Sequence, residues 1–342
     1  MKPIRCLLIF LVLTGFFGGA SIAQPCLPEG IVFNLQSEID SFQINYPGCT
    51  EISGDVDIAS SWSMISNLDS LNVLTFIGGD LKIQVRDVMT SLSGLENLDS
   101  VGGDLMIRYC DRLSDLSGLD NLKKVNGEFM ISYNDGITSL HGLENLSIVG
   151  EDLRIIAYGA LLTLEGLDNI NSIGAGIDIR AHFYLSSISV FNDINYIPGT
   201  VRIKDNNTLN DLSGFSNLDS IGFNLTIDNN NSLTSLAAFL NLKNIGSSII
   251  IQDNTFLEKF SGLEGISSID GNLYISGNRA IINLAGLENL TSIGGEIRIE
   301  ENLNLNDLSG LENVTHVGQL VWVKSNPNLL TLSGMNGIAV LH

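Results

Sequence analysis

Positive charge and aromatic rings coincide in one part of this acidic chain. The sequence has 38 acidic and 17 basic residues, so an anionic ligand would be repelled over most of the surface and attracted at a basic cluster. Arginine and aromatic side chains are also enriched at binding interfaces. These residues form what we call the candidate ligand patch: Arg154, Tyr158, Arg180, Tyr184, Arg202 and Lys204.

The same region also has a structural interpretation. Arg154, Asp178 and Arg202 recur at one repeat position, where alternating charges would form a ladder and the aromatic rings would fill corners. The units around them are the least regular of the chain, because Val190 and Pro198 replace recurring glycines. Irregular units often carry function rather than stacking, so both interpretations stay open.

Catalytic and metal-binding chemistry is poorly represented. No histidine stands at a recognised metal-ligand spacing, and the four histidines are His141, His182, His316 and His342. Enzymes built on a β-helix need a cleft with clustered carboxylates, usually made by long loop insertions, and this sequence has almost none. We therefore predict a protein that is not an enzyme and that holds no cofactor or metal.

Two acidic columns are an alternative source of chemistry. Carboxylates stacked on successive repeat units repel one another, and Ca²⁺ would relieve that repulsion. A single column rarely offers the six to eight oxygens that Ca²⁺ prefers, so a solvated rim is the favoured interpretation. The columns are Asp80, Asp104, Glu128 and Asp152, and Glu96, Asp120, Glu144 and Asp168.

The element that must position all these residues is a repeat of about 24 residues. A fixed period of this kind indicates a solenoid, in which each unit contacts only its neighbours. Val190 and Ala238 fill the two steps at which the marker glycine is missing. The glycine recurs at Gly94, Gly118, Gly142, Gly166, Gly214, Gly262, Gly286, Gly310 and Gly334.

Within a unit, two apolar residues stand two positions apart, which is the spacing of one face of a β-strand. Leu105 and Ile107 are one such pair, and an apolar residue follows at every third position from Cys110 to Val125. Short strands joined by tight corners fit this pattern better than helices. From Val56 to Val323 the pairs predict an all-β solenoid, a β-helix with about twelve leucine-rich-like rungs.

Two asparagine columns belong to this scaffold. Asparagine side chains can bond to backbone groups that a turn leaves unpaired, so stacked asparagines form ladders. The second column runs from Asn97 to Asn313 at another corner. The first column, which we call the structural ladder, contains Asn134 and also Asn206, Asn230, Asn254, Asn278, Asn302 and Asn326.

The ends of the chain differ from the repeats. Residues 1–23 have a basic start, a short apolar run and small residues before Gln24, which indicates a secretory signal peptide and no membrane insertion. Residues 24–51 are predicted to form an N-terminal cap that Cys26 and Cys49 staple with a disulfide bond. Cys110 is expected to be a buried free thiol.

The solenoid is predicted to occupy residues 52–342. No comparable cap follows Leu341 and His342, so we expect either a truncated gene product or a last rung that pairs with another chain. The net charge of −21 argues against nucleic acid and anionic membranes as partners.

The stretch from Pro47 to Ile58 resembles the opening of a receptor L-domain, with Cys49 followed by an Ile-x-Gly-x-Val-x-Ile strand. The resemblance covers about residues 47–342. It implies a right-handed, leucine-rich-repeat-like β-helix. In animal growth-factor receptors two such domains bind hormone, and similar repeats occur in fungal cell-wall proteins. The segment from Cys26 to Cys49 also resembles the one that precedes the repeats in secreted L-domain proteins of Gram-negative bacteria.

These observations predict a secreted, non-catalytic binding or adhesion module. Its ribbed surface would meet a protein or a glycan at the cell exterior. A structural protein of an envelope or matrix is the alternative, and a β-helix enzyme acting on polysaccharides is a more distant one.

Overall fold

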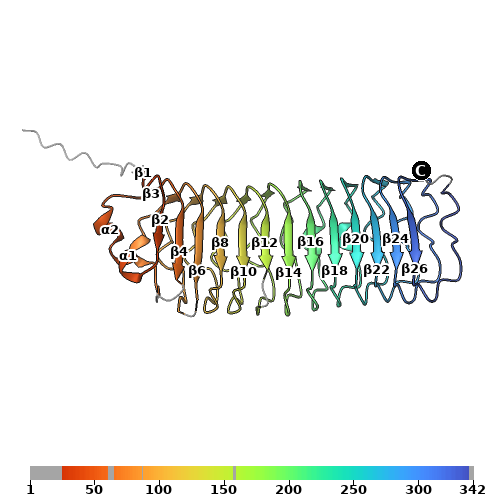
Figure 1. The fold of residues 1–342 in the computed structure, drawn as a ribbon, viewed down its shortest axis with the longest axis horizontal. Coiled ribbons are helices and arrows are strands. Elements are labelled where there is room, and N and C mark those ends of the chain that lie inside the picture. The colour runs from red at the N-terminus through yellow and green to blue at the C-terminus, as the bar shows by residue number, and fades with distance from the viewer. Residues whose placement is uncertain (1–24, 61–64, 87, 157–158, 339–342) are drawn as a thin grey trace, which may run out of the picture.

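The computed structural model describes residues 25–60, 65–86, 88–156 and 159–338, which form one elongated β-solenoid (Figure 1). The predicted leader and Tyr158 lie outside the described residues. One long side of the solenoid is a 13-stranded parallel sheet, which we call the main sheet. Its strands follow one another in chain order, as the repeat requires, so the all-β solenoid predicted from the sequence is confirmed.

The main sheet contains every predicted apolar pair. Equivalent residues of successive units are hydrogen-bonded neighbours, as Ile131 and Ile155 are. Between β4 and β6 the paired residues are one position further apart in the sequence, since Val56 pairs with Leu81. The strands are β2 (Ile31–Phe33), β4 (Val56–Ser60), β6 (Leu81–Val85), β8 (Leu105–Arg108), β10 (Phe129–Ser132), β12 (Leu153–Ile156), β14 (Ile177–Arg180), β16 (Val201–Lys204), β18 (Leu225–Asp228), β20 (Ile249–Gln252), β22 (Leu273–Ser276), β24 (Ile297–Glu300) and β26 (Val321–Lys324).

A second side of the solenoid carries two-residue strands in two shorter sheets. The seven-stranded sheet contains β1 (Pro25–Cys26), β3 (Glu51–Ile52), β5 (Phe76–Ile77), β7 (Ser100–Val101), β9 (Lys124–Val125), β11 (Ile148–Val149) and β13 (Ser172–Ile173). The six-stranded sheet contains β15 (Tyr196–Ile197), β17 (Ser220–Ile221), β19 (Asn244–Ile245), β21 (Ser268–Ile269), β23 (Ser292–Ile293) and β25 (His316–Val317).

Pro198 explains why this side is interrupted between β13 and β15. In neighbouring coils the residue at this position donates its backbone N–H to the preceding coil, as Gly174 does to Val149 and Gly222 does to Ile197. Proline has no N–H to donate, so the equivalent bond to Ile173 cannot form. The irregularity that the sequence shows at Pro198 is therefore a local break in one sheet, while the main sheet continues through it.

The core is a continuous stack of inward side chains. The predicted series of every third residue is buried, for example at Leu113, Leu116 and Leu119, which are all 0% exposed. In the middle of the chain the stack becomes aromatic, with Phe191, Phe215 and Phe239 at ring-centroid distances of 5.7 and 5.5 Å. Burial of this stack between neighbouring coils is the main stabilising force, because no coil has a core of its own.

Corner glycines allow the coils to approach closely. At Gly94, φ is +107°, and a Cβ atom would lie 2.0 Å from the carbonyl oxygen of Leu68 in the preceding coil. At three corners the chain instead forms a short 3-10 helix, one of which contains Ala238 and another Gly214. Such helices are η1 (Asp69–Leu71), η2 (Ser213–Phe215) and η3 (Ala237–Phe239).

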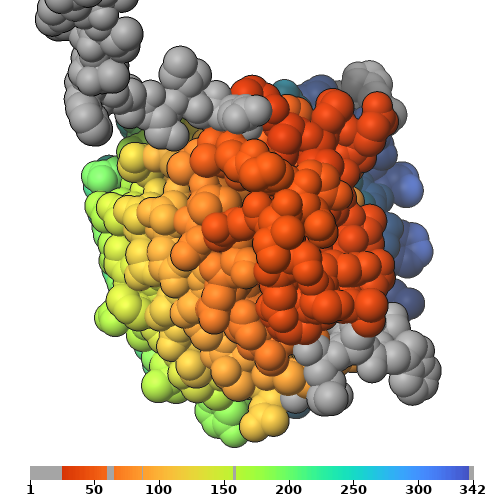
Figure 2. Space-filling view, turned by 90° about the vertical axis from the view of Figure 1, so that its left-hand side faces the viewer, coloured from red at the N-terminus to blue at the C-terminus, as the bar shows by residue number. Residues whose placement is uncertain are grey.

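The N-terminal segment forms the first coil and covers the end of the core (Figure 2). Its strand β1 belongs to the seven-stranded sheet, and its strand β2 belongs to the main sheet. Two short helices, α1 (Gln36–Asp40) and α2 (Phe42–Asn45), lie between β2 and β3. Ile39 and Phe42 point inward and are 0% exposed. The apolar side of these two helices is therefore packed on the first coils.

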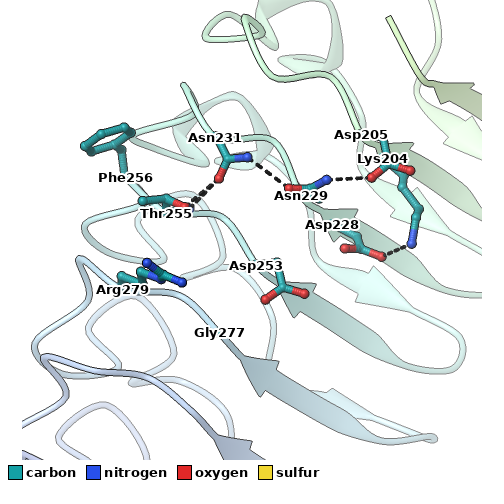
Figure 3. Close-up of a pocket in the computed structure, with 10 residues that line it drawn as sticks. All are labelled: Lys204, Asp205, Asp228, Asn229, Asn231, Asp253, Thr255, Phe256, Gly277 and Arg279. Carbon is teal, nitrogen blue, oxygen red and sulfur yellow. Dashed lines mark hydrogen bonds and ion pairs between the residues drawn. The ribbon is translucent and has the colours of Figure 1, made fainter. Parts of the chain in front are cut away.

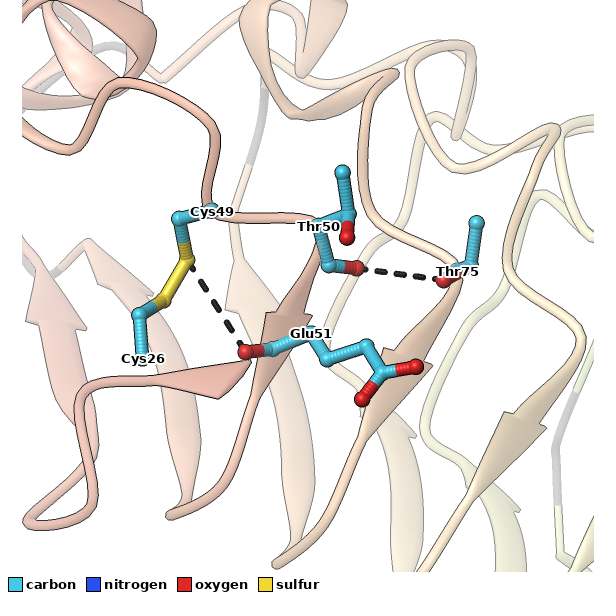
Figure 4. The surroundings of a disulfide bond; sticks show 5 residues. All are labelled: Cys26, Cys49, Thr50, Glu51 and Thr75. Carbon is cyan, nitrogen blue, oxygen red and sulfur yellow. Dashed lines mark hydrogen bonds between the residues drawn. A yellow bond between two sulfur atoms is a disulfide. The ribbon is translucent and has the colours of Figure 1, made fainter. Parts of the chain in front are cut away.

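The disulfide bond between Cys26 and Cys49 is present, as predicted (Figure 4). Its Cα atoms are 5.7 Å apart, which is the usual separation for this bond. It links β1 to the residues just before β3, and Cys49 is buried. The bond therefore ties the beginning of the first coil to its end.

Candidate binding surfaces

The structural ladder is buried except at the half-buried Asn326, and its side chains bind the backbone of neighbouring coils. In Asn254, Oδ1 accepts the backbone N–H of Asn230 at 3.0 Å, and Nδ2 donates to the carbonyl of Ile227 at 2.9 Å. The same pair of bonds recurs along the column. At Asn206 the backbone N–H that Oδ1 accepts belongs to His182 rather than to an asparagine. The column consists of Asn134, Asn206, Asn230, Asn254, Asn278, Asn302 and Asn326.

Two other residue types occupy positions of this column among the described residues. His182 Nε2 lies 3.0 Å from the carbonyl oxygen of Ile155, and Cys110 Sγ donates to the carbonyl of Ile83 at 3.7 Å. Each bond spans 27 residues, as the asparagine bonds do, so His182 and Cys110 occupy asparagine positions. Burial lowers the pKa of His182 to about 4 and raises the pKa of the Cys110 thiol to about 11.

The first acidic column is also part of the scaffold. Asp80 Oδ1 accepts the backbone N–H of Asp104, and Asp104 Oδ1 accepts that of Glu128, at 2.9 and 2.8 Å. Asp152 binds the N–H of Gly176 in the same way at 2.7 Å. One oxygen of each of these carboxylates is therefore committed to the next coil.

The second acidic column closes the glycine corners. Glu96, for example, accepts the N–H of Gly94 at 2.8 Å, and Asp120 accepts that of Gly118 at 2.8 Å. Within residues 25–338, where described, no group of three or more His, Cys, Asp or Glu side chains is placed to hold a metal ion. The recurring acids thus have a hydrogen-bonding role that the sequence analysis did not consider.

The outer asparagine column likewise binds backbone. Asn97 donates to the carbonyl of Asn72 at 2.7 Å, and Asn121 donates to that of Glu96 at 2.6 Å. Equivalent bonds of Asn145, Asn169, Asn217, Asn241, Asn289 and Asn313 follow in later coils. The asparagine columns and the first acidic column thus bind the backbone of neighbouring coils, and the second acidic column binds the glycine corner of its own coil.

The four cations of the candidate ligand patch lie on adjacent strands β12, β14 and β16 and are paired with carboxylates. Arg154 Nη2 is 2.8 Å from Asp152, and Lys204 Nζ is 2.6 Å from Asp228. Arg180 and Arg202 both approach Asp178 Oδ2, at 3.3 and 3.9 Å. Neighbouring carboxylates therefore balance much of the positive charge of the patch.

Asp178 is the central acid of this group. It is 9% exposed, and its Oδ1 atom is buried without a hydrogen-bond partner. Burial raises the pKa of this carboxyl above its ordinary value, while Arg180, Arg202 and Arg154 act in the opposite direction. The contacts follow the charge-ladder interpretation in part, since Arg154 pairs with Asp152 and Glu128 rather than with Asp178.

The aromatic members of the patch are less constrained. Tyr184 lies in the turn after β14 and is 57% exposed. Tyr158 lies outside the described residues. His182, which the sequence places in the same turn, is instead buried in the structural ladder.

A second cluster, which the sequence analysis did not single out, combines arginine with tyrosine. We call it the Arg–Tyr stack, and it consists of Arg86, Arg108, Tyr109 and Tyr133. The rings of Tyr109 and Tyr133 are nearly parallel, with centroids 5.2 Å apart. The guanidinium groups of Arg86 and Arg108 lie 4.7 and 5.3 Å from the centroid of Tyr109, within cation–π range.

The two tyrosines share a position directly after a main strand, which we call the corner column. Its residues have left-handed backbone, with φ of +57° at Tyr109 and +55° at Tyr133. Further along the chain the column contains Ala181, Asp205, Asn229, Asp253, Gly277, Glu301 and Ser325. Two tyrosines one period apart, where other units carry small or polar residues, are the signal that could have revealed the stack.

Charge distinguishes the Arg–Tyr stack from the candidate ligand patch. Arg86 and Arg108 make no salt bridge with any described residue, whereas all four cations of the patch do. Arg86 and Tyr133 are exposed, and Arg108 Nε is buried without a hydrogen-bond partner. Tyrosine and arginine are the residue types that most often dominate binding energy at interfaces.

The described residues form a β-solenoid of the leucine-rich-repeat type. An internalin, InlF, from Listeria monocytogenes str. 4b F2365 has a similar fold, with a TM-score of 0.50 over 90% of this chain and 87% of that chain. The two sequences are 15% identical, so the likeness concerns the fold. No protein-family model matches the sequence, and a comparison with curated proteins finds no match. No described helix is long and apolar enough to cross a membrane.

Proposed function

We propose that this protein is an extracellular, non-catalytic binding module that docks a protein partner on the Arg–Tyr stack. The observation that carries the proposal is the pairing of the exposed Arg86 and the half-buried Arg108 with a tyrosine ring rather than with carboxylates. A partner that presents acidic and aromatic side chains would gain ionic and stacking contacts there. The leader predicted at residues 1–23 and the disulfide bond support an extracellular location.

The scaffold suits such a role because it leaves its outer side chains free to vary. The recurring acids and asparagines bind backbone groups within or between coils, so the residues that differ from coil to coil decide what the surface recognises. We retain the receptor L-domain family as a proposed affiliation, supported by the stretch from Pro47 to Ile58. That the last rung pairs with another chain stays a prediction.

The test is a quantitative pull-down from native cell-surface extract with the mature chain as bait. Arg86→Glu combined with Tyr109→Ala should lose the partner that the wild-type chain enriches. Lys124→Glu is the control, because it reverses one exposed charge on the short-stranded side of the solenoid. The proposal is wrong if the double variant enriches the same partner as efficiently as the wild type.

The candidate ligand patch remains a second proposed docking surface, for an anionic protein or glycan. Its support is the grouping of Arg154, Arg180, Arg202 and Lys204 beside the exposed Tyr184. A structural role in an envelope or matrix is the alternative function, and it predicts that neither surface affects partner recovery.

A further inference from the structure

A hollow lies elsewhere on the described coils, between the ends of β16 and β22 (Figure 3). It measures about 630 Å³ and crosses four coils at the corner column. Its walls combine Asp253, Arg279, Phe256 and a row of asparagines. None of these residues belongs to the Arg–Tyr stack or to the recurring ladders described above.

Gly277 makes the hollow possible. The preceding three members of the corner column, Asp205, Asn229 and Asp253, carry side chains, and Gly277 does not. A Cβ atom on Gly277 would lie 2.0 Å from Oδ1 of Asp253. The carboxylate of Asp253 therefore lies over the backbone of Gly277, in space that a side chain would otherwise fill.

One wall of the hollow is a fixed row of polar groups. Thr255 Oγ1 donates to Asn231 Oδ1 at 2.5 Å, and Asn231 Nδ2 donates to Asn229 Oδ1 at 2.9 Å. Asn229 Nδ2 in turn donates to Asp205 Oδ1 at 2.7 Å (Figure 3). Such a chain holds its amides in one orientation, which lowers the ordering cost of a ligand that bonds to them.

The side chains of Asp253 and Arg279, which also line the hollow, have unused hydrogen-bonding capacity. Neither the carboxylate of Asp253 nor the guanidinium of Arg279 makes a hydrogen bond or salt bridge within the described residues. Carboxylate and guanidinium are planar and can each bind two adjacent hydroxyl groups. Phe256, which is 60% exposed, adds an apolar ring face at the rim.

We propose that this hollow binds a neutral glycan. Vicinal hydroxyls of a sugar ring match Asp253, Arg279 and the amide row, and the C–H face of the ring matches Phe256. An acidic glycan fits less well, because Asp205, Asp228 and Asp253 lie in the lining and the chain has a net charge of −21. A metal ion fits less well because Lys204 pairs with Asp228 and Arg279 faces the same space.

The test measures binding of the mature protein to soluble neutral glycans, such as a β-glucan, a mannan, a galactan and a xylan, by calorimetry. A polyuronate is the anionic comparison, and a chelator is added in a parallel series. Gly277→Asn fills the hollow with a residue that the corner column accepts at Asn229. Ser325→Asn is the matched control, because it makes the same change in exposed left-handed backbone outside the hollow, with φ of +56°.

We expect the wild type and Ser325→Asn to bind at least one neutral glycan equally, and Gly277→Asn to bind it at least about tenfold more weakly. Arg279→Ala changes an exposed side chain and should give a similar loss, so the test does not depend on one variant folding. The inference is overturned if no neutral glycan binds, if both hollow variants bind like the wild type, if the polyuronate is preferred, or if chelation abolishes binding. Loss of glycan binding with an intact protein partner, or the reverse, separates this inference from the proposed function.

Discussion

The backbone N–H of His182 donates to Oδ1 of Asn206, 3.1 Å away in the following coil. The imidazole thus occupies a ladder position without breaking the ladder, because its Nε2 atom reaches the carbonyl of Ile155. The Nδ1 atom is buried with no hydrogen-bond partner. This substitution leaves one unpaired nitrogen in the core that can take up a proton only at a cost.

Acid should therefore weaken the fold through His182. Its folded pKa, about 4, lies below the usual value of 6.5, so the unfolded chain binds the proton more readily. Stability is full above about pH 6.5 and falls as the pH drops toward 4, by a total of about 3 kcal/mol from this group. His182→Asn should remove that part of the pH dependence, which denaturant unfolding at several pH values would measure. Parallel pH profiles for the two proteins would contradict the assignment.

The buried ladder should matter more than the outer asparagine column. Asn254→Ala removes the bonds to Ile227 and Gln252 and leaves the buried N–H of Asn230 unpaired, so we expect a loss of about 2–4 kcal/mol in the free energy of unfolding. Asn241→Ala removes a single exposed bond to Ser216 and should cost about 1 kcal/mol or less. Chemical unfolding of both variants gives the comparison, and equal losses would argue against a special role for the buried column.

Cys110 should be chemically silent in the native protein. The thiol is buried and forms no disulfide bond, and its pKa is raised to about 11, so almost no thiolate is present at neutral pH. Labelling with a maleimide should follow the rate of local or global unfolding and should become fast in denaturant. Rapid labelling of the native protein at this residue would show that the neighbouring coils open easily.

The arginines around Asp178 should stabilise the protein mainly near neutral pH. Arg180→Gln combined with Arg202→Gln removes both partners of Asp178 and should raise the pKa of its carboxyl further above the ordinary value. A group with a raised folded pKa destabilises the protein above its unfolded pKa, and protonation relieves this as the pH falls. The stability difference from wild type, about 1–2 kcal/mol at neutral pH, should therefore shrink in acid.

The same double variant tests the candidate ligand patch. If the patch binds a partner, recovery in the pull-down should fall while Arg86→Glu with Tyr109→Ala leaves it unchanged. The opposite pattern would assign docking to the Arg–Tyr stack. Lys124→Glu again serves as the control.

The sequence was sufficient to predict the scaffold because its period fixes which residues meet. Ile131 and Ile155 pair because they stand at the same position of adjacent units, and Cys26 and Cys49 bracket the segment that has no repeat of its own. Surface chemistry could not be predicted in the same way. Whether Arg180 is free or paired depends on how its side chain lies against Asp178, and the hollow depends on an absent side chain at Gly277. The 24-residue repeat alone predicts neither the pairing of Arg180 nor the hollow at Gly277.

Pro198 has a mechanical consequence. Over most of the long axis, adjacent coils are held together on two sides, but between β13 and β15 the short-stranded side has no ladder. A tensile load along the axis would therefore concentrate on the main-sheet bonds between β14 and β16. We expect a molecule pulled from its ends to part first at that coil, and Pro198→Gly to raise the rupture force by restoring a donor there.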